Sequence, residues 1–410
     1  MMKTKSALFL SAILLLSAFA GAADKAPATS STQTLRVFST STSALQQLHD
    51  RVASGKYSHP ALDKLRSEAN KALKMEPVSV MQKTITPPSG NKHDYLSLAR
   101  YWWPDLTRPG GLPYMRRDGE VNPETSQVQD EHHLNAMITA TTRLSLAYYL
   151  FGDERYAEQA TKLMRVWFLD PETRMNPNMK HAQLTRGRNT GRGSGLIDSR
   201  RLSVVVDNIG LLAGSKAWTP ADQSGMQQWF AQYLKWLRES DNGRKEALAE
   251  NNHGSFYDVQ VASIALFLGD TGLATKVLKN ETGRVAEQVN KDGGQPRELE
   301  RTRALWYSTF NLSALFQLAQ LGENVGVDLW TFQTKDGRSI RKALDFLTPY
   351  ITSEKKWPYK QIDHYPNTAI LPLYLRAAVQ YKAPEYEDVA RKIQPGPSDD
   401  IACLLATLGN

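Results

Sequence analysis

Residues 251–258, NNHGSFYD, place two amides and an imidazole at the head of the apolar run VQVASIALFL. Nothing in helix formation asks for Asn252 and His253 in series, since both side chains are poorly suited to burial. An amide and an imidazole can instead hydrogen-bond a ligand, and an imidazole can also move a proton near neutral pH. The alternative is that Asn252 is only an N-cap, as asparagine commonly is at a helix start.

A second group of chemically able residues follows at 292–311, DGGQPRELERTRALWYSTFN. Arg303 and Tyr307 lie four residues apart and would share one helix face. Arg301 and Tyr307 lie six apart, about 120° round the helix axis, so they converge on one ligand only if the helix begins after Arg301. The Gly and Pro residues at 293–296 favour a loop just before that point. Both arginines stay open as partners of an anion.

Two long connections, 94–124 and 176–201, carry many of the other aromatic and basic side chains. Long loops inside a compact domain are commonly functional. Flat aromatic faces stack on sugar rings, and guanidinium groups pair with carboxylates. The candidate substrate-binding residues from these loops are Tyr101, Trp102, Trp103, Arg116, Arg188 and Arg192. The alternative is two solvated surface loops whose tryptophans turn into the core.

Three histidines are further candidates for the wall of the same site. His132 and His133 are adjacent, so on a helix they point about 100° apart, unlike a pair of metal ligands at i,i+4. We therefore expect one to face the cleft and the other the surface, with no metal. His364, in the loop KQIDHYPN, is a candidate for a third wall.

Composition limits the compartment and the partner. The formal net charge of +8 suits an anionic polymer, although many proteins are mildly basic without a specific partner. No signature of nucleic-acid binding accompanies the basic loops. Cys403 is the single cysteine, which excludes an intramolecular disulfide.

The N-terminal residues have the pattern of a secretory signal peptide. Lys3 and Lys5 precede an apolar stretch at 7–20 and a small-residue AGA cleavage pattern. That stretch is short for a membrane span of about 20 residues. We expect residues 1–23 to be a signal peptide, the mature chain to be periplasmic or secreted, and no membrane insertion.

Along the rest of the chain, apolar residues recur at spacings of three and four, which predicts an all-α protein. Segments 148–164 and 265–280 both carry an aromatic–leucine run, Gly-Asp and an amphipathic stretch, as in a hairpin where glycine ends one helix and aspartate caps the next. Such hairpins must stack to bury both faces. We expect an (α/α) toroid, an incomplete barrel of antiparallel helix hairpins with long loops lining a central cleft; an open solenoid is the alternative.

The same spacing suggests where the elements and domains lie. Residues 24–58 should form a leader with a first helix near 42–55, and residues 59–410 a single toroid domain. Further helices are expected at 202–214, 220–238, 303–320, 338–351 and 368–381.

Together these motifs resemble a known family. Asn252-His253 at a helix start, followed about fifty residues later by DG-x-x-P-x-EL and R-x-R-A-L-x-Y, is similar to the alginate lyases among the polysaccharide lyases. The segments SLARYWWPDLTRPGGLPYMRRDGEVNPE and GRNTGRGSGLID resemble a branch of that superfamily, so the resemblance covers about 94 to 320. It implies an (α/α) toroid that cleaves polyuronates by β-elimination without a redox cofactor. The catalytic residues that it implies are Asn252, His253, Arg301 and Tyr307.

The residue types agree with that chemistry. The C5 proton of a uronate is weakly acidic until the carboxylate is neutralised, for which Arg301 and Asn252 are suited. A base must then take the proton and an acid must protonate the departing O4. Tyr307 does both in a syn elimination, with His253 holding the carboxylate or lowering the pKa of the tyrosine; in an anti elimination His253 is the base. Mannuronate, with the proton and O4 on one side, favours the tyrosine-only route.

Alginate rich in mannuronate is the expected substrate, followed by glucuronan or another unbranched polyuronate. Two other functions stay open. An inverting glycoside hydrolase on the same toroid needs two carboxylic acids across a cleft, for which Asp130, Glu131, Asp198 and Glu298 are available. A non-catalytic periplasmic polyuronate-binding protein needs no proton transfer.

Overall fold

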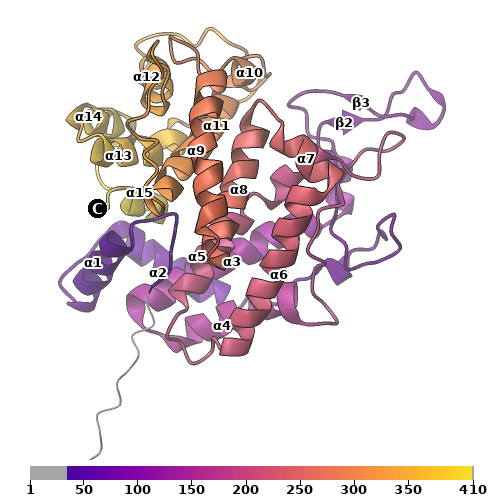
Figure 1. Ribbon diagram of the computed structural model, residues 1–410, viewed down its shortest axis with the longest axis horizontal. Coiled ribbons are helices and arrows are strands. Elements are labelled where there is room, and N and C mark those ends of the chain that lie inside the picture. The colour runs from indigo at the N-terminus through magenta and orange to yellow at the C-terminus, as the bar shows by residue number, and fades with distance from the viewer. Residues whose placement is uncertain (1–34, 409–410) are drawn as a thin grey trace, which may run out of the picture. The chain divides into compact units, whose positions relative to one another are not determined.

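The computed structural model describes residues 35–408, which belong to one compact unit. The expected signal peptide, 1–23, and the leader up to residue 34 lie outside the described residues. Figure 1 shows the described chain as helices joined by loops of very different length. No helix in this part of the chain is both long and apolar enough to cross a membrane.

The α-helices of residues 35–408 include one at each of the six expected ranges, with ends within a few residues of those expected, and others that the spacing did not assign. They are α1 (Thr42–Ala53), α2 (Pro60–Ala72), α3 (Asp130–Phe151), α4 (Glu154–Met164), α5 (Leu202–Leu211), α6 (Pro220–Glu239), α7 (Asp241–Ala247), α8 (Asn252–Leu268), α9 (Thr271–Gln288), α10 (Pro296–Leu299), α11 (Ala304–Glu323), α12 (Ile340–Ile351), α13 (Leu371–Gln380), α14 (Pro384–Ile393) and α15 (Ile401–Ala406).

Consecutive helices pair as the Gly-Asp repeat predicts. Gly152 ends α3 in the left-handed region at φ 71°, and the side chain of Asp153 accepts a hydrogen bond from the first turn of α4. Gly269 ends α8 at φ 81°, and Asp270 caps α9 in the same way. Glycine reaches this backbone conformation without a steric penalty, so each helix stops and the chain reverses. The predicted all-α toroid of helix hairpins is confirmed.

Helix α8 is the centre of this packing. It contacts α5, α6, α9 and α11, and most of its side chains are buried. A helix that is apolar on all sides can be stable only when neighbours cover every face. The start of α8 therefore has a fixed position relative to the start of α11, which packs beside it.

The two long loops are joined to each other by short strands. Within residues 35–408 the strands are β1 (Leu96–Leu98), β2 (Trp102–Trp103), β3 (Met115–Arg116) and β4 (His181–Leu184). β1 pairs in parallel with β4, and β2 pairs antiparallel with β3 in a hairpin that projects at the right of Figure 1. The loop at 94–124 (the aromatic loop) and the loop at 176–201 (the arginine-rich loop) are thus held side by side.

Truncation in the middle of α8 should destabilise the whole unit. Ile264 is 0% exposed, and Ile264→Ala should lower the free energy of unfolding by about 2–5 kcal/mol, because the lost packing leaves a cavity. Urea denaturation measures the loss. Lys276→Ala on the exposed face of α9 is the control and should change stability by less than about 0.5 kcal/mol; equal effects from both variants would contradict the central position of α8.

Candidate active site

A cavity of about 880 Å³ lies where the starts of α8 and α11 meet the two long loops. Basic side chains outnumber acidic ones along its walls, which suits an anionic ligand. The basic ones are Arg100, Arg116, Arg192, Arg200, Lys245, Arg301 and Arg303, and the acidic ones are Glu131, Asp198 and Glu246. Within residues 35–408 no group of three His, Cys, Asp or Glu side chains is placed to hold a metal ion.

At the start of α8, Asn251 caps the helix and Asn252 bonds to a different partner. The cap is Asn251, whose side chain accepts a hydrogen bond from the backbone N–H of His253. Asn252, 1% exposed, donates its backbone N–H to Glu298 at 2.7 Å and its side-chain nitrogen to both oxygens of that carboxylate at 2.9 and 3.0 Å. The interpretation of Asn252 as a plain N-cap is therefore wrong, and its amide nitrogen serves Glu298.

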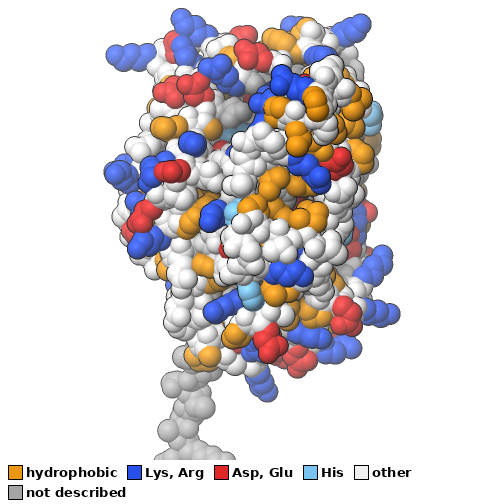
Figure 2. Space-filling view, turned by 90° about the vertical axis from the view of Figure 1, so that its right-hand side faces the viewer, with side chains coloured by type: hydrophobic (Ala, Val, Ile, Leu, Met, Phe, Trp, Pro, Cys, Tyr) orange, Lys and Arg blue, Asp and Glu red, His pale blue; other side chains and the backbone are white. Residues whose placement is uncertain are grey.

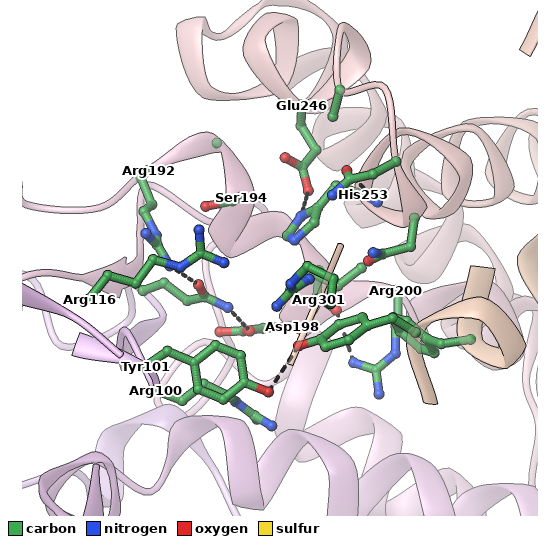
Figure 3. A pocket seen from close by; sticks show the side chains of 18 of the residues that line it. Arg100, Tyr101, Arg116, Arg192, Ser194, Asp198, Arg200, Glu246, His253 and Arg301 are labelled. Carbon is green, nitrogen blue, oxygen red and sulfur yellow. Dashed lines mark hydrogen bonds and ion pairs between the residues drawn. The ribbon is translucent and has the colours of Figure 1, made fainter. Parts of the chain in front are cut away.

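His253 is oriented by a carboxylate that sequence reasoning missed. Nδ1 of His253 lies 2.7 Å from Oε1 of Glu246, a residue at the end of α7 that is 3% exposed. A carboxylate beside Nδ1 favours the tautomer with the proton on Nδ1 and the lone pair on Nε2. Figure 3 shows this pair at one side of the cavity, with the imidazole pointing toward Arg301. His253 is thus arranged to accept a proton.

Arg301 and Tyr307 converge because α11 begins at Ala304. Arg301 lies before the helix, and its guanidinium carbon is 3.6 Å from the centroid of the Tyr307 ring. The Tyr307 hydroxyl donates to the Tyr101 hydroxyl at 2.9 Å. Burial raises the pKa of Tyr307, the charge of Arg301 lowers it, and Tyr101 adds to the rise. The phenol is therefore protonated at neutral pH and has a second phenol as its partner.

Arg303 borders the same cavity but is held differently. It precedes the first residue of α11 and forms an ion pair with Asp363, while its guanidinium carbon is 5.7 Å from the Trp306 ring. The charge of Arg303 is thus shared with the 359–365 loop. Of the two arginines, Arg301 is the one that lies on the face of the tyrosine.

The floor of the cavity is a hydrogen-bonded chain of polar side chains. Arg192 donates to Gln183 at 2.7 Å, and Gln183 donates to Asp198 at 2.9 Å. Asp198 also accepts from the Ser97 hydroxyl at 2.6 Å. Gln183 has a positive φ of 51°, an uncommon backbone for a residue other than glycine and one that often marks a functional site.

The four acidic side chains considered for hydrolysis are mostly engaged elsewhere. Asp130 is fully buried in an ion pair with Lys83 at 2.9 Å. Asp198 belongs to the floor network, and Glu298 holds Asn252. Glu131 borders the cavity but pairs with Arg100. No two of these carboxylates face each other across the cavity with free oxygens, so the geometry gives no support to an inverting hydrolase.

Five of the ten predicted substrate-binding residues line the cavity. They are Tyr101, Trp102, Arg116, Arg192 and Arg303. Trp102 is half-buried, with the guanidinium carbon of Arg192 5.6 Å from its ring centroid, so it does not turn fully into the core. Figure 2, which faces the side of the hairpin, shows hydrophobic side chains gathered at the middle and upper right of this face, with Lys and Arg around them.

The other five lie outside the walls of the cavity. Trp103 donates its indole N–H to the Glu120 carbonyl at 3.0 Å, and the guanidinium carbon of Arg188 lies over the Trp102 ring, 4.9 Å from its centroid. His132 lines a separate groove between α2 and α3. Burial lowers the pKa of His133, and the carbonyl of His364 accepts the Trp306 indole N–H at 3.3 Å. For these residues, spacing alone could not distinguish cavity wall from loop scaffold.

Three carboxylates hold other residues of the site in place, and no pattern in the sequence indicated these roles. Glu246 lies seven residues before His253, and only the folded turn brings it behind the imidazole. Glu298 was considered only as a hydrolytic acid, and it instead holds Asn252. Asp118, which holds Arg301, comes from a loop 183 residues earlier. Trp306, on the cavity wall, could have been predicted from its place one residue before Tyr307.

Replacing Glu246 should change the tautomer of His253. In Glu246→Gln the amide can either accept from or donate to Nδ1, so the share of the Nδ1–H tautomer should fall. Nitrogen chemical shifts of His253 measured by NMR above pH 8 report this share. Glu250→Gln, on the exposed side of the same turn, is the control. An unchanged tautomer in the Glu246→Gln protein would mean that Glu246 does not set it.

The carboxyl group of Glu131 should make stability depend on pH. Burial raises its pKa to about 7 from an ordinary 4.5, the charge of Asp198 adds to the rise, and Arg100 and Arg200 oppose it. The folded protein therefore binds this proton more tightly than the unfolded chain, so its contribution to stability is present below pH 4.5 and lost as the pH rises through 7. Relative to Glu131→Gln, urea denaturation should show the wild type losing roughly 2–3 kcal/mol over this window; parallel pH profiles would contradict the raised pKa.

Comparisons with known proteins identify the family and the fold. The sequence profile of the alginate lyase family matches residues 79–357. A crystal structure of an alginate lyase from Bacteroides ovatus is 39% identical, with a TM-score of 0.86, and the match covers 91% of this chain and 100% of that one. No curated protein matches the chain.

More distant structures share the fold. Alginate lyase A1-III from Sphingomonas species A1 is 14% identical, with a TM-score of 0.56 over 86% of this chain and 95% of that one. A variant of the same enzyme complexed with a tetrasaccharide is 14% identical, with a TM-score of 0.57 over 86% of this chain and 94% of that one. On the extent of the profile match and the identity to the Bacteroides protein, the chain belongs to the alginate lyase family of polysaccharide lyases.

Proposed function

We propose that this protein cleaves alginate, with mannuronate-rich blocks preferred, by β-elimination at the C4–O4 bond. The observation that carries the proposal is the contact of Arg301 with the ring of Tyr307 in a cation-rich cavity that also contains His253. Elimination needs a cation beside the substrate carboxylate, a base beside the C5 proton and an acid beside the leaving O4. All three must lie within the span of one sugar ring. The names of the related structures support alginate as the polymer.

The first requirement is neutralisation of the substrate carboxylate. Arg301 supplies a guanidinium that is part-buried, with 14% of its side chain exposed, where charge interactions are less screened than in water. Asn252 was expected to assist, but its nitrogen is bonded to Glu298. Arg301 therefore carries most of this task, and Asn252 acts chiefly by fixing the start of α8.

The second requirement is proton transfer. The base removes the C5 proton, the electron pair forms the C4–C5 double bond, the C4–O4 bond breaks, and O4 takes a proton from the acid. For mannuronate, where the proton and O4 lie on one side, Tyr307 is proposed as both base and acid. In this route the Tyr307 phenol first loses its proton to water, a loss that the charge of Arg301 favours and the hydrogen bond to Tyr101 opposes. The phenolate then takes the C5 proton and returns it to the departing O4.

His253 supports a second stereochemical route. With Nδ1 beside Glu246, the favoured tautomer has its lone pair on Nε2, which can accept a proton. An anti elimination would use His253 as base and Tyr307 as acid. The signal-peptide pattern expected at residues 1–23 further leads us to propose a periplasmic or secreted enzyme that meets the polymer outside the cytoplasm.

Removing one phenolic oxygen should abolish the reaction and spare binding. Tyr307→Phe should lower kcat on polymannuronate by about 100-fold to 10,000-fold, because the proton donor is lost, while calorimetric affinity for a mannuronate trimer stays within a few fold. The rate is followed as ultraviolet absorbance of the C4–C5 double bond on a panel of polymannuronate, polyguluronate and glucuronan.

The matched control is Tyr149→Phe, which removes an exposed hydroxyl contact to Gln46 and should keep full activity. Release of reducing ends without absorbance would show hydrolysis instead of elimination. Binding without any cleavage of the panel by the wild type would favour a non-catalytic polyuronate-binding protein.

A further inference from the structure

The carboxylate of Asp118, in the long loop at 94–124, contacts the segment at 292–311 that contains Arg301 and Tyr307. It accepts hydrogen bonds from Arg301 Nε at 3.1 and 3.2 Å and from Arg301 Nη2 at 2.7 Å. It also accepts from the backbone N–H of Thr302 at 3.2 Å, and the Thr302 hydroxyl donates to the Asp118 carbonyl at 2.9 Å. Asp118 thus holds the guanidinium at two nitrogens, Nε and Nη2, and the backbone N–H of Thr302 bonds to the same carboxylate.

These contacts leave the Nη1 side of the Arg301 guanidinium for a ligand. Nε and Nη2 are occupied by Asp118, and one face of the guanidinium lies on Tyr307. Among residues 35–408 none accepts a hydrogen bond from Nη1, and Arg301 lines the cavity. A planar guanidinium fixed on one edge and one face can present only its remaining N–H groups, so a bound carboxylate has one direction of approach.

Asp118 also limits the charge that the cavity offers. Burial alone would raise the pKa of Asp118, but the hydrogen bonds and charge of Arg301 hold it well below its usual range, so the carboxylate stays ionised. Arg116, on the cavity wall, forms a second ion pair with Asp118 at 2.6 Å. One anion therefore compensates two guanidinium groups, and Arg301 keeps its place through charge as well as shape.

We propose that Asp118 is a positioning residue for the elimination, fixing the Arg301 guanidinium so that its free N–H edge meets the uronate carboxylate beside Tyr307. This inference rests on the proposed function. It makes Asp118 act on the rate of the reaction more than on the strength of binding: without Asp118 the cavity gains net positive charge, which favours an anion, but Arg301 loses its orientation.

Asp118→Asn should therefore lower turnover without weakening binding. On polymannuronate, kcat should fall by about 100-fold, the cost of a misplacement of roughly 1 Å. In the non-cleaving Tyr307→Phe background, calorimetric affinity of the Asp118→Asn protein for a mannuronate trimer should be unchanged or tighter. Asp118→Glu, which restores the charge, should recover part of kcat.

The control is Asp105→Asn on the same loop, which removes an ion pair with Arg108 at 2.9 Å and should not change kcat. Affinity and kcat falling together in Asp118→Asn would show a merely structural role, and an unchanged kcat would overturn the proposal outright. If Asp118→Asn does not fold, the same two measurements on Asp118→Glu decide the matter, with kcat expected to fall about 10-fold at unchanged affinity. A wild type that yields no absorbing product from any polyuronate would instead overturn the proposed function itself.

Discussion

The contact between the Arg301 guanidinium and the Tyr307 ring is the constraint on which the site depends. It places a positive charge 3.6 Å from the ring of the group that can exchange a proton. A cation over an aromatic face is favourable by about 0.5–2 kcal/mol, which by itself would not hold a long side chain. The contact exists because α11 begins only at Ala304, so that Arg301 reaches the tyrosine from an irregular segment.

Three polar residues of the cavity are each held by a carboxylate. Glu246 lies behind His253, Glu298 behind Asn252, and Asp118 beside Arg301. A buried carboxylate is costly unless it is paired, so each acid favours one orientation of its partner. The burial of Glu298 raises its pKa, while its hydrogen bonds to Asn252 oppose that rise. The cavity is thus preorganised by ionic contacts before any substrate arrives.

Sequence reasoning predicted the helices, the Gly-Asp hairpins and the convergence of two distant motifs, because these features follow from local spacing. Glycine and aspartate at 152–153 and 269–270 determine where helices end, whatever the rest of the chain does. It also predicted that α11 must start after Arg301, from the loop residues before it.

It could not predict the partners that come from elsewhere in the chain. Asp118 and Arg301 meet only because β2–β3 folds back over the second motif, and no local pattern encodes that contact. For Trp103, Arg188, His132, His133 and His364 the residue types were suitable, but the direction of each side chain depends on tertiary packing. In Asn252, the same amide group could cap, bind a ligand or hold a carboxylate, and the buried Glu298 decides among these.

The two long loops line part of the cavity, whereas the helices form most of the packed interior. β1 and β4 hold the aromatic and arginine-rich loops together, whereas the buried bulk of the protein lies in the middles of helices such as α8. Changes at loop residues that line the cavity, such as Trp102 and Arg192, therefore alter its wall without changing the packing around α8. A lineage built on this plan can exchange loop residues to accept differently shaped or differently charged polysaccharides, while the helices keep His253 and Tyr307 in place.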